Sequence, residues 1–182
     1  TALSGNGAYV IPVGGTIGVT GAQTAIIDFS EIGGYTELTA NFNAASPGAF
    51  ASATNLAISE CGNDVYKKWL GNGYWTIDAT GTVSGAEYNV ELRPDPVSYT
   101  APGTYSVTAC KRPSGGPVTS FAMDGDCNPA STLNPAAPRV YRDNITTGFS
   151  DIVVIVDNTD PFPVELLSLS AEAQAEHILL NW

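Results

Sequence analysis

The chain offers few side chains for catalysis. Its only histidine, His177, is the one residue that could serve as base in a Ser-His-Asp or Cys-His site, and it lies between Glu176 and Ile178 near the carboxyl end. No nucleophile elbow, phosphate-binding loop or dinucleotide-binding fingerprint occurs in the sequence. Glu87 and Glu91 share a face of an expected strand, as a glycosidase pair would, but a solvated outer face explains them more simply. We therefore expect that the protein is not an enzyme.

Oxygen-bearing side chains gather at two places that could hold calcium. One group is Asp124 and Asp126 with Asn128, and the other runs from Asp157 to Asp160. Calcium takes six to eight oxygen ligands, and neither group supplies that many alone. Ordinary turns, in which Asp and Asn side chains bond to nearby backbone, are the alternative interpretation. Calcium is the only cofactor that the sequence suggests.

Aromatic residues lie close together in one stretch and could form a platform for a sugar. The candidates are Trp69, Tyr74 and Trp75, with Tyr66 just before them. On a strand, Tyr74 and Trp75 point to opposite faces, so only one of them can belong to the core. Packing in a core or an interface is the competing interpretation.

Three cysteines, Cys61, Cys110 and Cys127, leave one unpaired if an oxidising compartment joins the other two. Cys110 and Cys127 flank a connection rich in Gly and Pro, so they are the preferred disulfide pair. Cys61 with Cys110 is the alternative. A zinc site is not indicated, because no C-x-x-C spacing occurs and the histidine lies far along the chain.

The composition limits the partners of this 182-residue chain. Seven Lys and Arg against 18 Asp and Glu give a formal charge of −11, which argues against binding to nucleic acid and to anionic membranes. No apolar run reaches the ~18 residues of a membrane span. Charged residues make up only 14% of the chain, with 19 Gly and 12 Pro, below the typical ~25%. This composition favours a secreted or cell-surface all-β protein, and the start at Thr1 indicates a mature or excised piece.

The elements that would position these residues are short strands. Apolar residues recur at every second position, with Leu38, Ala40 and Phe42 on one face of the strand 35–42. The continuous apolar run 152–156 predicts a strand that is covered on both faces. Other expected strands are 8–13, 24–29, 55–60, 74–78, 88–93, 105–110 and 118–123, and a helical turn is expected at 65–70. About ten strands in two antiparallel sheets predict a β-sandwich, of jelly-roll or Ig-like type, over residues 1–157.

The C-terminal segment 158–182 breaks this pattern. A stiff Asp/Pro linker with Pro161 and Pro163 leads into two apolar stretches, 164–170 and 178–182. A two-stranded hairpin is marginally stable in water, and apolar strands with open edges tend to find partners. The segment could fold back, could begin a second domain, or could add to a neighbouring copy. The residues expected to carry self-association are Val164, Leu166, Leu167, Leu169, Ile178, Leu180 and Trp182.

The stretch from Pro161 to Leu169, followed by Leu179 to Trp182, resembles the "LPVELLSF…LNW" opening of a fibronectin-like domain. That domain recurs before the sorting signal of Bacteroidota proteins exported by type IX secretion. Phe162 replaces the usual Leu and Leu169 the usual aromatic residue. Upstream, the stretches 9–14, 74–77, 88–93, 112–113 and 147–151 are similar to the sandwich domain that often precedes this segment. The resemblance implies a secreted or surface-attached, non-catalytic module.

Together these observations predict a structural or adhesive module of a secreted cell-surface protein. We expect copies to associate head-to-tail through the C-terminal strands into a filament. The alternative is a carbohydrate-binding module, with or without calcium. A hydrolase is a third class, and nothing in the sequence favours it.

Overall fold

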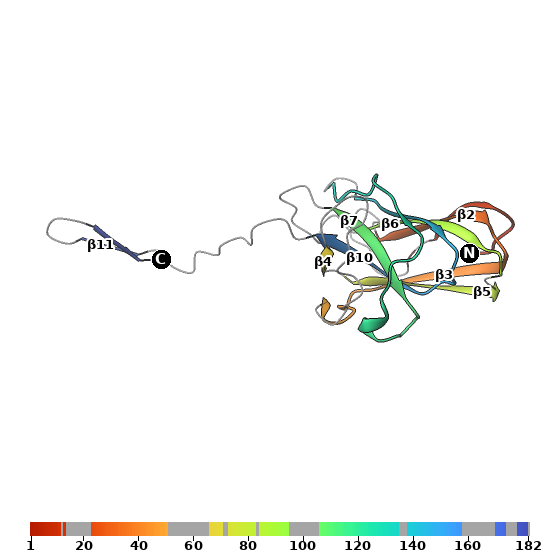
Figure 1. Ribbon diagram of the computed structural model, residues 1–182, viewed down its shortest axis with the longest axis horizontal. Helices are drawn as coiled ribbons and strands as arrows, with labels where there is room; N and C mark the ends of the chain where they lie inside the picture. The colour runs from red at the N-terminus through yellow and green to blue at the C-terminus, as the bar shows by residue number, and fades with distance from the viewer. Residues whose placement is uncertain are drawn as a thin grey trace.

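The computed structural model describes residues 1–11, 13, 23–50, 66–70, 73–82, 84–94, 106–134, 138–157, 170–173 and 178–181. The last two ranges and residues 67, 68 and 157 are described by backbone alone. In this part of the chain the architecture is all-β, with two antiparallel sheets packed against each other (Figure 1). The expected β-sandwich is therefore confirmed. The same residues include no apolar helix of the length that a membrane crossing requires.

The first sheet has the strand order β1-β2-β6-β9-β8. Its central strands alternate between buried and exposed residues, so one face is turned to the core. In β2 and β6 the paired residues Ile27 and Val90 both lie on that buried face. The strand bounds are β1 (Gly7–Ile11), β2 (Thr24–Glu31), β6 (Glu87–Arg93), β8 (Asp126–Cys127) and β9 (Val140–Ile145).

The second sheet is built around β10, which pairs with β7 on one side and with β5 and β4 on the other. The edge strand β3 pairs with β5 along its whole length. Because β4 and β5 follow each other along the same side of β10, they act as one strand interrupted at residues 70–73. The bounds are β3 (Gly34–Asn43), β4 (Tyr66–Trp69), β5 (Tyr74–Thr82), β7 (Val107–Arg112) and β10 (Asp151–Asp157).

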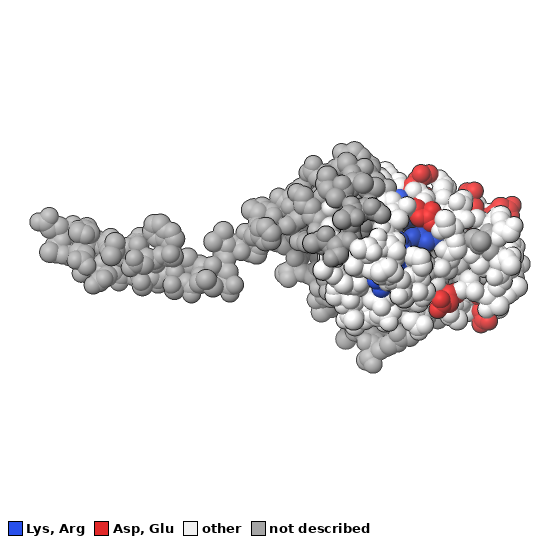
Figure 2. Space-filling view, turned by 60° about the horizontal axis from the view of Figure 1, so that its bottom comes forward, with Lys and Arg blue, Asp and Glu red and all other residues white. Residues whose placement is uncertain are grey.

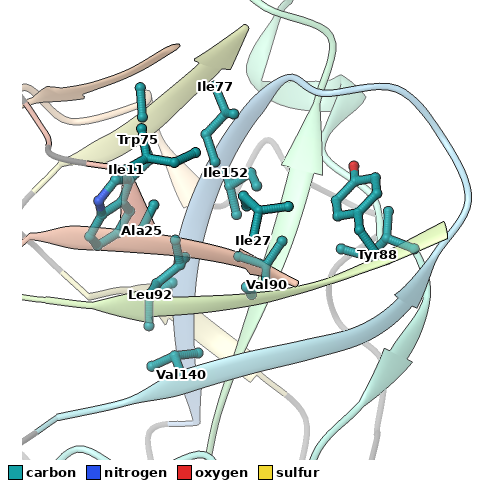
Figure 3. Packing of buried hydrophobic residues seen from close by; sticks show 14 of the residues in the cluster. Ile11, Ala25, Ile27, Trp75, Ile77, Tyr88, Val90, Leu92, Val140 and Ile152 are labelled. Carbon is teal, nitrogen blue, oxygen red and sulfur yellow. The ribbon is translucent and has the colours of Figure 1, made fainter. Parts of the chain in front are cut away.

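The main hydrophobic core lies between the two sheets (Figure 3). Trp75 is the largest side chain in it and is 2% exposed. Its ring meets Phe42 edge-on at 4.9 Å between centroids, and its indole N–H donates to the Gln23 carbonyl at 3.0 Å. The indole is therefore buried with its one polar atom satisfied, as a large aromatic residue in a core requires.

A second, smaller cluster covers the outer face of the second sheet. Val153 and Ile155 of β10 point into it, whereas their neighbours Ile152, Val154 and Val156 point into the main core. Both faces of β10 are thus buried, as the continuous apolar run predicted. The other fully buried members of this cluster are Tyr66, Cys110 and Phe121.

Two expected elements are wrong. The helical turn at 65–70 is the strand β4, because its backbone pairs with β10, with Trp69 opposite Ile155. The expected strand 118–123 is instead a short 3-10 turn at Val118–Ser120, followed by a single bridge from Ala122 to Lys111. The expected strand 55–60 lies outside the described residues.

The strands β11 (Ser170–Ala173) and β12 (Ile178–Asn181) form a sheet of their own. They pair in register from Ser170 opposite Asn181 to Ala173 opposite Ile178. Figure 1 shows this hairpin apart from the sandwich. Among the side chains that the structure describes, the buried residues of both clusters lie between Ile11 and Val156.

Candidate functional site

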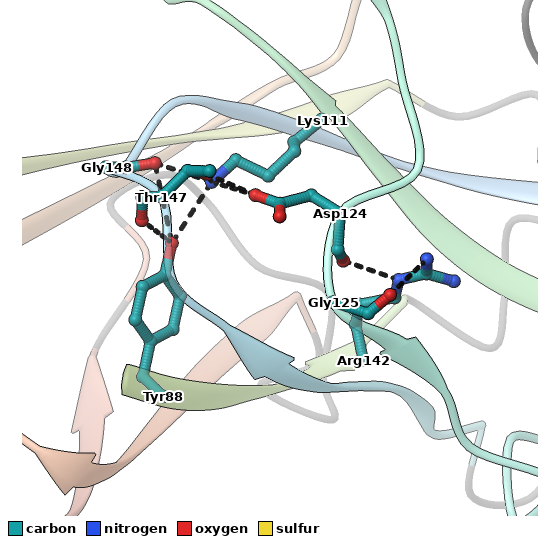
Figure 4. Close-up of polar contacts among 7 residues, drawn as sticks. All are labelled: Tyr88, Lys111, Asp124, Gly125, Arg142, Thr147 and Gly148. Atoms are coloured by element: carbon teal, nitrogen blue, oxygen red, sulfur yellow. Dashed lines mark hydrogen bonds and ion pairs between the residues drawn. The ribbon is translucent and has the colours of Figure 1, made fainter. Parts of the chain in front are cut away.

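A cluster of polar side chains lies at one end of the sandwich, where β7 and the connection between β9 and β10 meet (Figure 4). Lys111 comes from β7, Asp124 from the segment that crosses its edge, and Tyr88 from β6. Thr147 and Gly148 belong to the connection. Residues from both sheets therefore converge on one amino group.

The ammonium group of Lys111 is fully engaged. It donates to the Thr147 hydroxyl at 2.6 Å, to the Gly148 carbonyl at 2.5 Å and to the Tyr88 hydroxyl at 3.2 Å. A carboxylate oxygen of Asp124 lies 3.1 Å away and also accepts a hydrogen bond from Thr147. An ammonium has three protons to donate, so this set of acceptors saturates it.

Burial sets the electrostatics of this cluster. It lowers the pKa of Lys111, because a charged amine is disfavoured away from water, and the nearby Asp124 carboxylate partly opposes that effect. Burial also raises the pKa of Tyr88, so its phenol stays protonated. That phenol donates to the Thr147 carbonyl at 3.0 Å, and its ring stacks on Phe149 at 4.3 Å. The cluster thus joins the two sheets through satisfied polar groups.

Arg142 of β9 extends this junction. It is 2% exposed and donates to the carbonyls of Asp124 at 2.7 Å and Gly125 at 2.9 Å, and to the Thr108 hydroxyl at 3.2 Å. Gly125 has φ +72°, and a Cβ there would lie 2.1 Å from a backbone oxygen, so only glycine fits. The segment around Asp124 is therefore fixed at both its side chain and its backbone.

A second buried ion pair, between Arg112 and Asp151, holds the outer layer on the second sheet. The guanidinium Nε lies 3.0 Å from the carboxylate, and the side chains are 7% and 2% exposed. Asp151 also accepts from the Thr76 hydroxyl at 2.8 Å and the Gly115 amide at 3.2 Å. The guanidinium lies 4.6 Å from the Phe121 ring centre, a cation–π contact that ties the outer cluster to the ion pair.

An open groove of about 480 Å³ lies beside these two ion pairs. Met123 and Phe149 form part of its apolar wall, and Ser120 and Ser150 bring hydroxyl groups. Ser150 is 4% exposed, and its hydroxyl has no hydrogen-bond partner among the described residues. The groove therefore combines an apolar wall with the hydroxyl of Ser120, while the Ser150 hydroxyl lies buried behind its surface.

The aromatic residues expected to bind sugar are used for packing. Trp75 belongs to the core, so the prediction is wrong for it. Trp69 packs between Phe50 and Phe121, with centroid distances of 4.6 and 5.0 Å, and donates to the Gly48 carbonyl at 2.8 Å. Tyr74 lies under the Arg112 guanidinium at 5.2 Å.

The expected disulfide between Cys110 and Cys127 is also wrong. Cys110 is a buried thiol in β7, where it packs with Val153 in the outer cluster. The same observation overturns the alternative pair of Cys61 with Cys110. Cys61 itself lies outside the described residues.

Two of the four expected calcium ligands, Asp124 and Asp126, have partners within the chain. Asp124 faces Lys111, and Asp126 accepts from the Asn144 amide at 2.8 Å. Asp157 ends β10, and Asp160 lies outside the described residues. Within the part of the chain that the structure describes, no group of three or more His, Cys, Asp or Glu side chains could hold a metal ion.

The expected acid pair takes two different environments. Glu91 contacts Arg93 at 2.7 Å and Arg139 at 3.3 Å, whereas Glu87 accepts from the Ser30 hydroxyl at 3.1 Å. Of the residues expected to carry self-association, Ile178 and Leu180 belong to β12. The others, Val164, Leu166, Leu167, Leu169 and Trp182, lie outside the described residues.

Sequence reasoning missed Lys111, Arg112 and their partners. One feature of the sequence could have drawn attention to them. The chain has only seven Lys and Arg residues, and Lys111 and Arg112 are adjacent at the end of a stretch with alternating apolar residues. Figure 2 shows how few basic side chains reach the surface on one face, while acidic ones lie mostly near its rim. No family model, curated protein or solved structure matches the chain.

Proposed function

We propose that this chain is a non-catalytic structural or adhesive module of a secreted cell-surface protein, and that copies associate head-to-tail through the C-terminal hairpin into a filament. The observation that carries the proposal is the hairpin β11–β12, which forms a sheet separate from the sandwich. Three of the four residues of β12 are apolar. Two strands alone bury too little surface to be stable, so a partner is needed.

The buried ion pairs of the sandwich suit a structural module. Lys111 and Arg112 occupy neighbouring positions in β7 and each faces a carboxylate, Asp124 and Asp151 respectively. These contacts fix the connections at one end of the sheets to the strands themselves. A module joined to its neighbours through its ends benefits from such fixed connections. The resemblance of the tail to segments of type IX secretion substrates supports an extracellular location.

The acidic charge of the chain gives the proposal a specific test. Copies with a formal charge of −11 repel each other, and salt screens that repulsion over about 8 Å at physiological ionic strength. Sedimentation velocity at several protein and salt concentrations should show species larger than one chain that grow as salt is raised. A single monomeric species under all these conditions would contradict the proposal.

The groove beside Lys111 supports a second candidate function, carbohydrate binding. Its apolar wall and the exposed hydroxyl of Ser120 form a surface of mixed character, suited to a neutral sugar. A glycan microarray probed with the full chain tests this candidate. Binding that Ser120→Ala weakens while Trp69→Phe leaves it unchanged would favour it, and an array without signal would exclude the glycans displayed.

A further inference from the structure

Four edges of the sandwich are covered in part or are short in the described part of the chain. The N-terminal residues cover part of β3, where Leu3 donates to the Thr36 carbonyl at 2.9 Å. Ala122 covers the end of β7 through two hydrogen bonds with Lys111, at 3.0 and 2.8 Å. The edge strands β4 and β8 are short, with four and two residues. Covering segments and short edge strands both discourage further pairing.

The remaining edge strand, β1, is different. It pairs with β2 along all five residues from Gly7 to Ile11, and no described residue pairs with its other side. Val10 of this strand is 60% exposed, and it is the only exposed large hydrophobic residue in the described part of the chain. An open edge with an exposed apolar residue is a template for strand addition.

The start of β1 is held firmly in place. The Asn6 side chain donates to the Ser30 carbonyl at 2.5 Å and accepts from the Ile32 amide at 2.9 Å. The Tyr9 hydroxyl donates to the Gly5 carbonyl at 2.7 Å. The edge is therefore already extended before any partner arrives, which lowers the entropic cost of adding a strand.

The strand β12 has the properties that this edge requires. In the hairpin it pairs with β11, and no other residue that the structure describes pairs with it, so its second edge can pair with another strand. Its first three residues, Ile178 to Leu180, are all apolar, and successive residues of a strand face opposite sides of a sheet. An added β12 would therefore bring apolar residues both to the core side of β1 and to the side of Val10.

The chain between the sandwich and the hairpin is long enough to reach a neighbour. Twelve residues separate Asp157 from Ser170. A chain of that length spans up to roughly 40 Å when extended. Resting on the proposed self-association, we infer that β12 of one copy adds to the outer edge of β1 in the next copy. The first sheet of each sandwich thereby gains the two strands of a neighbour's hairpin.

Hydrogen exchange on the assembled full chain tests this inference directly. Amides of residues 7–11 and 178–181 should become protected on assembly, whereas those of β8 and of residues 39–43 in β3 should not change. The reference is the full-length variant Leu179→Asp, which should stay monomeric and leave residues 7–11 unprotected. Protection at another edge in place of β1 would overturn the inference and leave the proposed function standing.

A charge at the acceptor edge provides the second readout. Val10→Lys should raise the protein concentration needed for assembly by about tenfold or more, because edge lysines oppose strand pairing. Thr39→Lys is the matched control, since it adds the same charge at an exposed position of β3. Equal assembly of the Val10→Lys and Thr39→Lys variants would overturn the inference. If the wild-type chain itself fails to assemble, the proposed function is wrong and the inference falls with it.

Discussion

The sandwich and the C-terminal hairpin differ in how their backbone edges and apolar residues are covered. Within the described residues, the sandwich buries two hydrophobic clusters, and other segments cover part of the edges of β3 and β7. The hairpin has two strands and no further strand paired to it in the described structure. Under the proposed function, the hairpin supplies association, whereas the buried clusters of the sandwich supply stability. Changes in the hairpin should therefore leave the stability of the sandwich intact.

The largest loss of stability is expected from the main core. Trp75→Ala removes its largest side chain and leaves a cavity, so it should lower the free energy of unfolding by about 4 kcal/mol. Urea denaturation followed by circular dichroism measures this loss. Trp75→Phe, which keeps an aromatic ring, should lose clearly less. Equal losses for the two variants would show that ring size does not matter at this position.

Breaking the ion pair between Arg112 and Asp151 should cause the second-largest loss of stability. Asp151→Asn leaves the Arg112 charge buried without its partner and should cost about 3 kcal/mol in urea denaturation. The control is the double variant Arg112→Leu with Asp151→Leu, which removes both charges and should recover part of the loss. A double variant less stable than the single one would mean that the charges themselves are not the cause.

The pair of Lys111 and Asp124 should have a smaller, pH-dependent effect. Asp124→Asn should cost about 2 kcal/mol at pH 7, because the buried ammonium loses its counter-charge. Burial lowers the folded-state pKa of Lys111, so the unfolded chain binds more protons between that pKa and the ordinary value near 10.4. Stability contributed by this group therefore rises with pH in that interval. Without the Asp124 carboxylate that pKa falls further, so the variant's loss relative to wild type should shrink as the pH rises toward about 10.4. A loss that deepens with pH would contradict this account.

The smallest effect on stability is expected in the hairpin. Leu179→Asp should change the free energy of unfolding of the sandwich by less than the uncertainty of the measurement, roughly 0.5 kcal/mol, because β12 pairs with β11 in a sheet separate from the two sheets of the sandwich. The comparison of the two regions would fail if this variant destabilised the sandwich as much as Asp151→Asn does.

The sequence predicts secondary structure well where the residues next to a position in the chain decide whether it lies in a strand. Alternation located β3 and β6, and the apolar run at 152–156 correctly indicated a strand covered on both faces. The stretch 65–70 failed because its spacing also suits a helical turn, and only pairing with β10 makes it a strand. The stretch 118–123 failed because the preceding Pro117 and a single bridge at Ala122 favour a turn.

The polar site could not be predicted in the same way. Lys111 and Arg112 follow directly on the expected strand 105–110, and their partners lie 13 and 39 positions further along the chain. Nothing local indicates which carboxylate each would meet. Cys110 is a similar case, since its burial against Val153 depends on how β7 pairs with β10. Contacts between distant segments are decided by topology rather than by local pattern.

The native mass of the full chain, measured by light scattering with negative-stain images of the same samples, tests the central claim most directly. Wild type should form assemblies that grow with concentration. Leu179→Asp should give the 18.9 kDa of one chain, while Asn181→Asp, which adds the same charge at a polar position of β12, should still assemble. A wild-type chain that stays at 18.9 kDa at every concentration would contradict the claim that the hairpin joins copies.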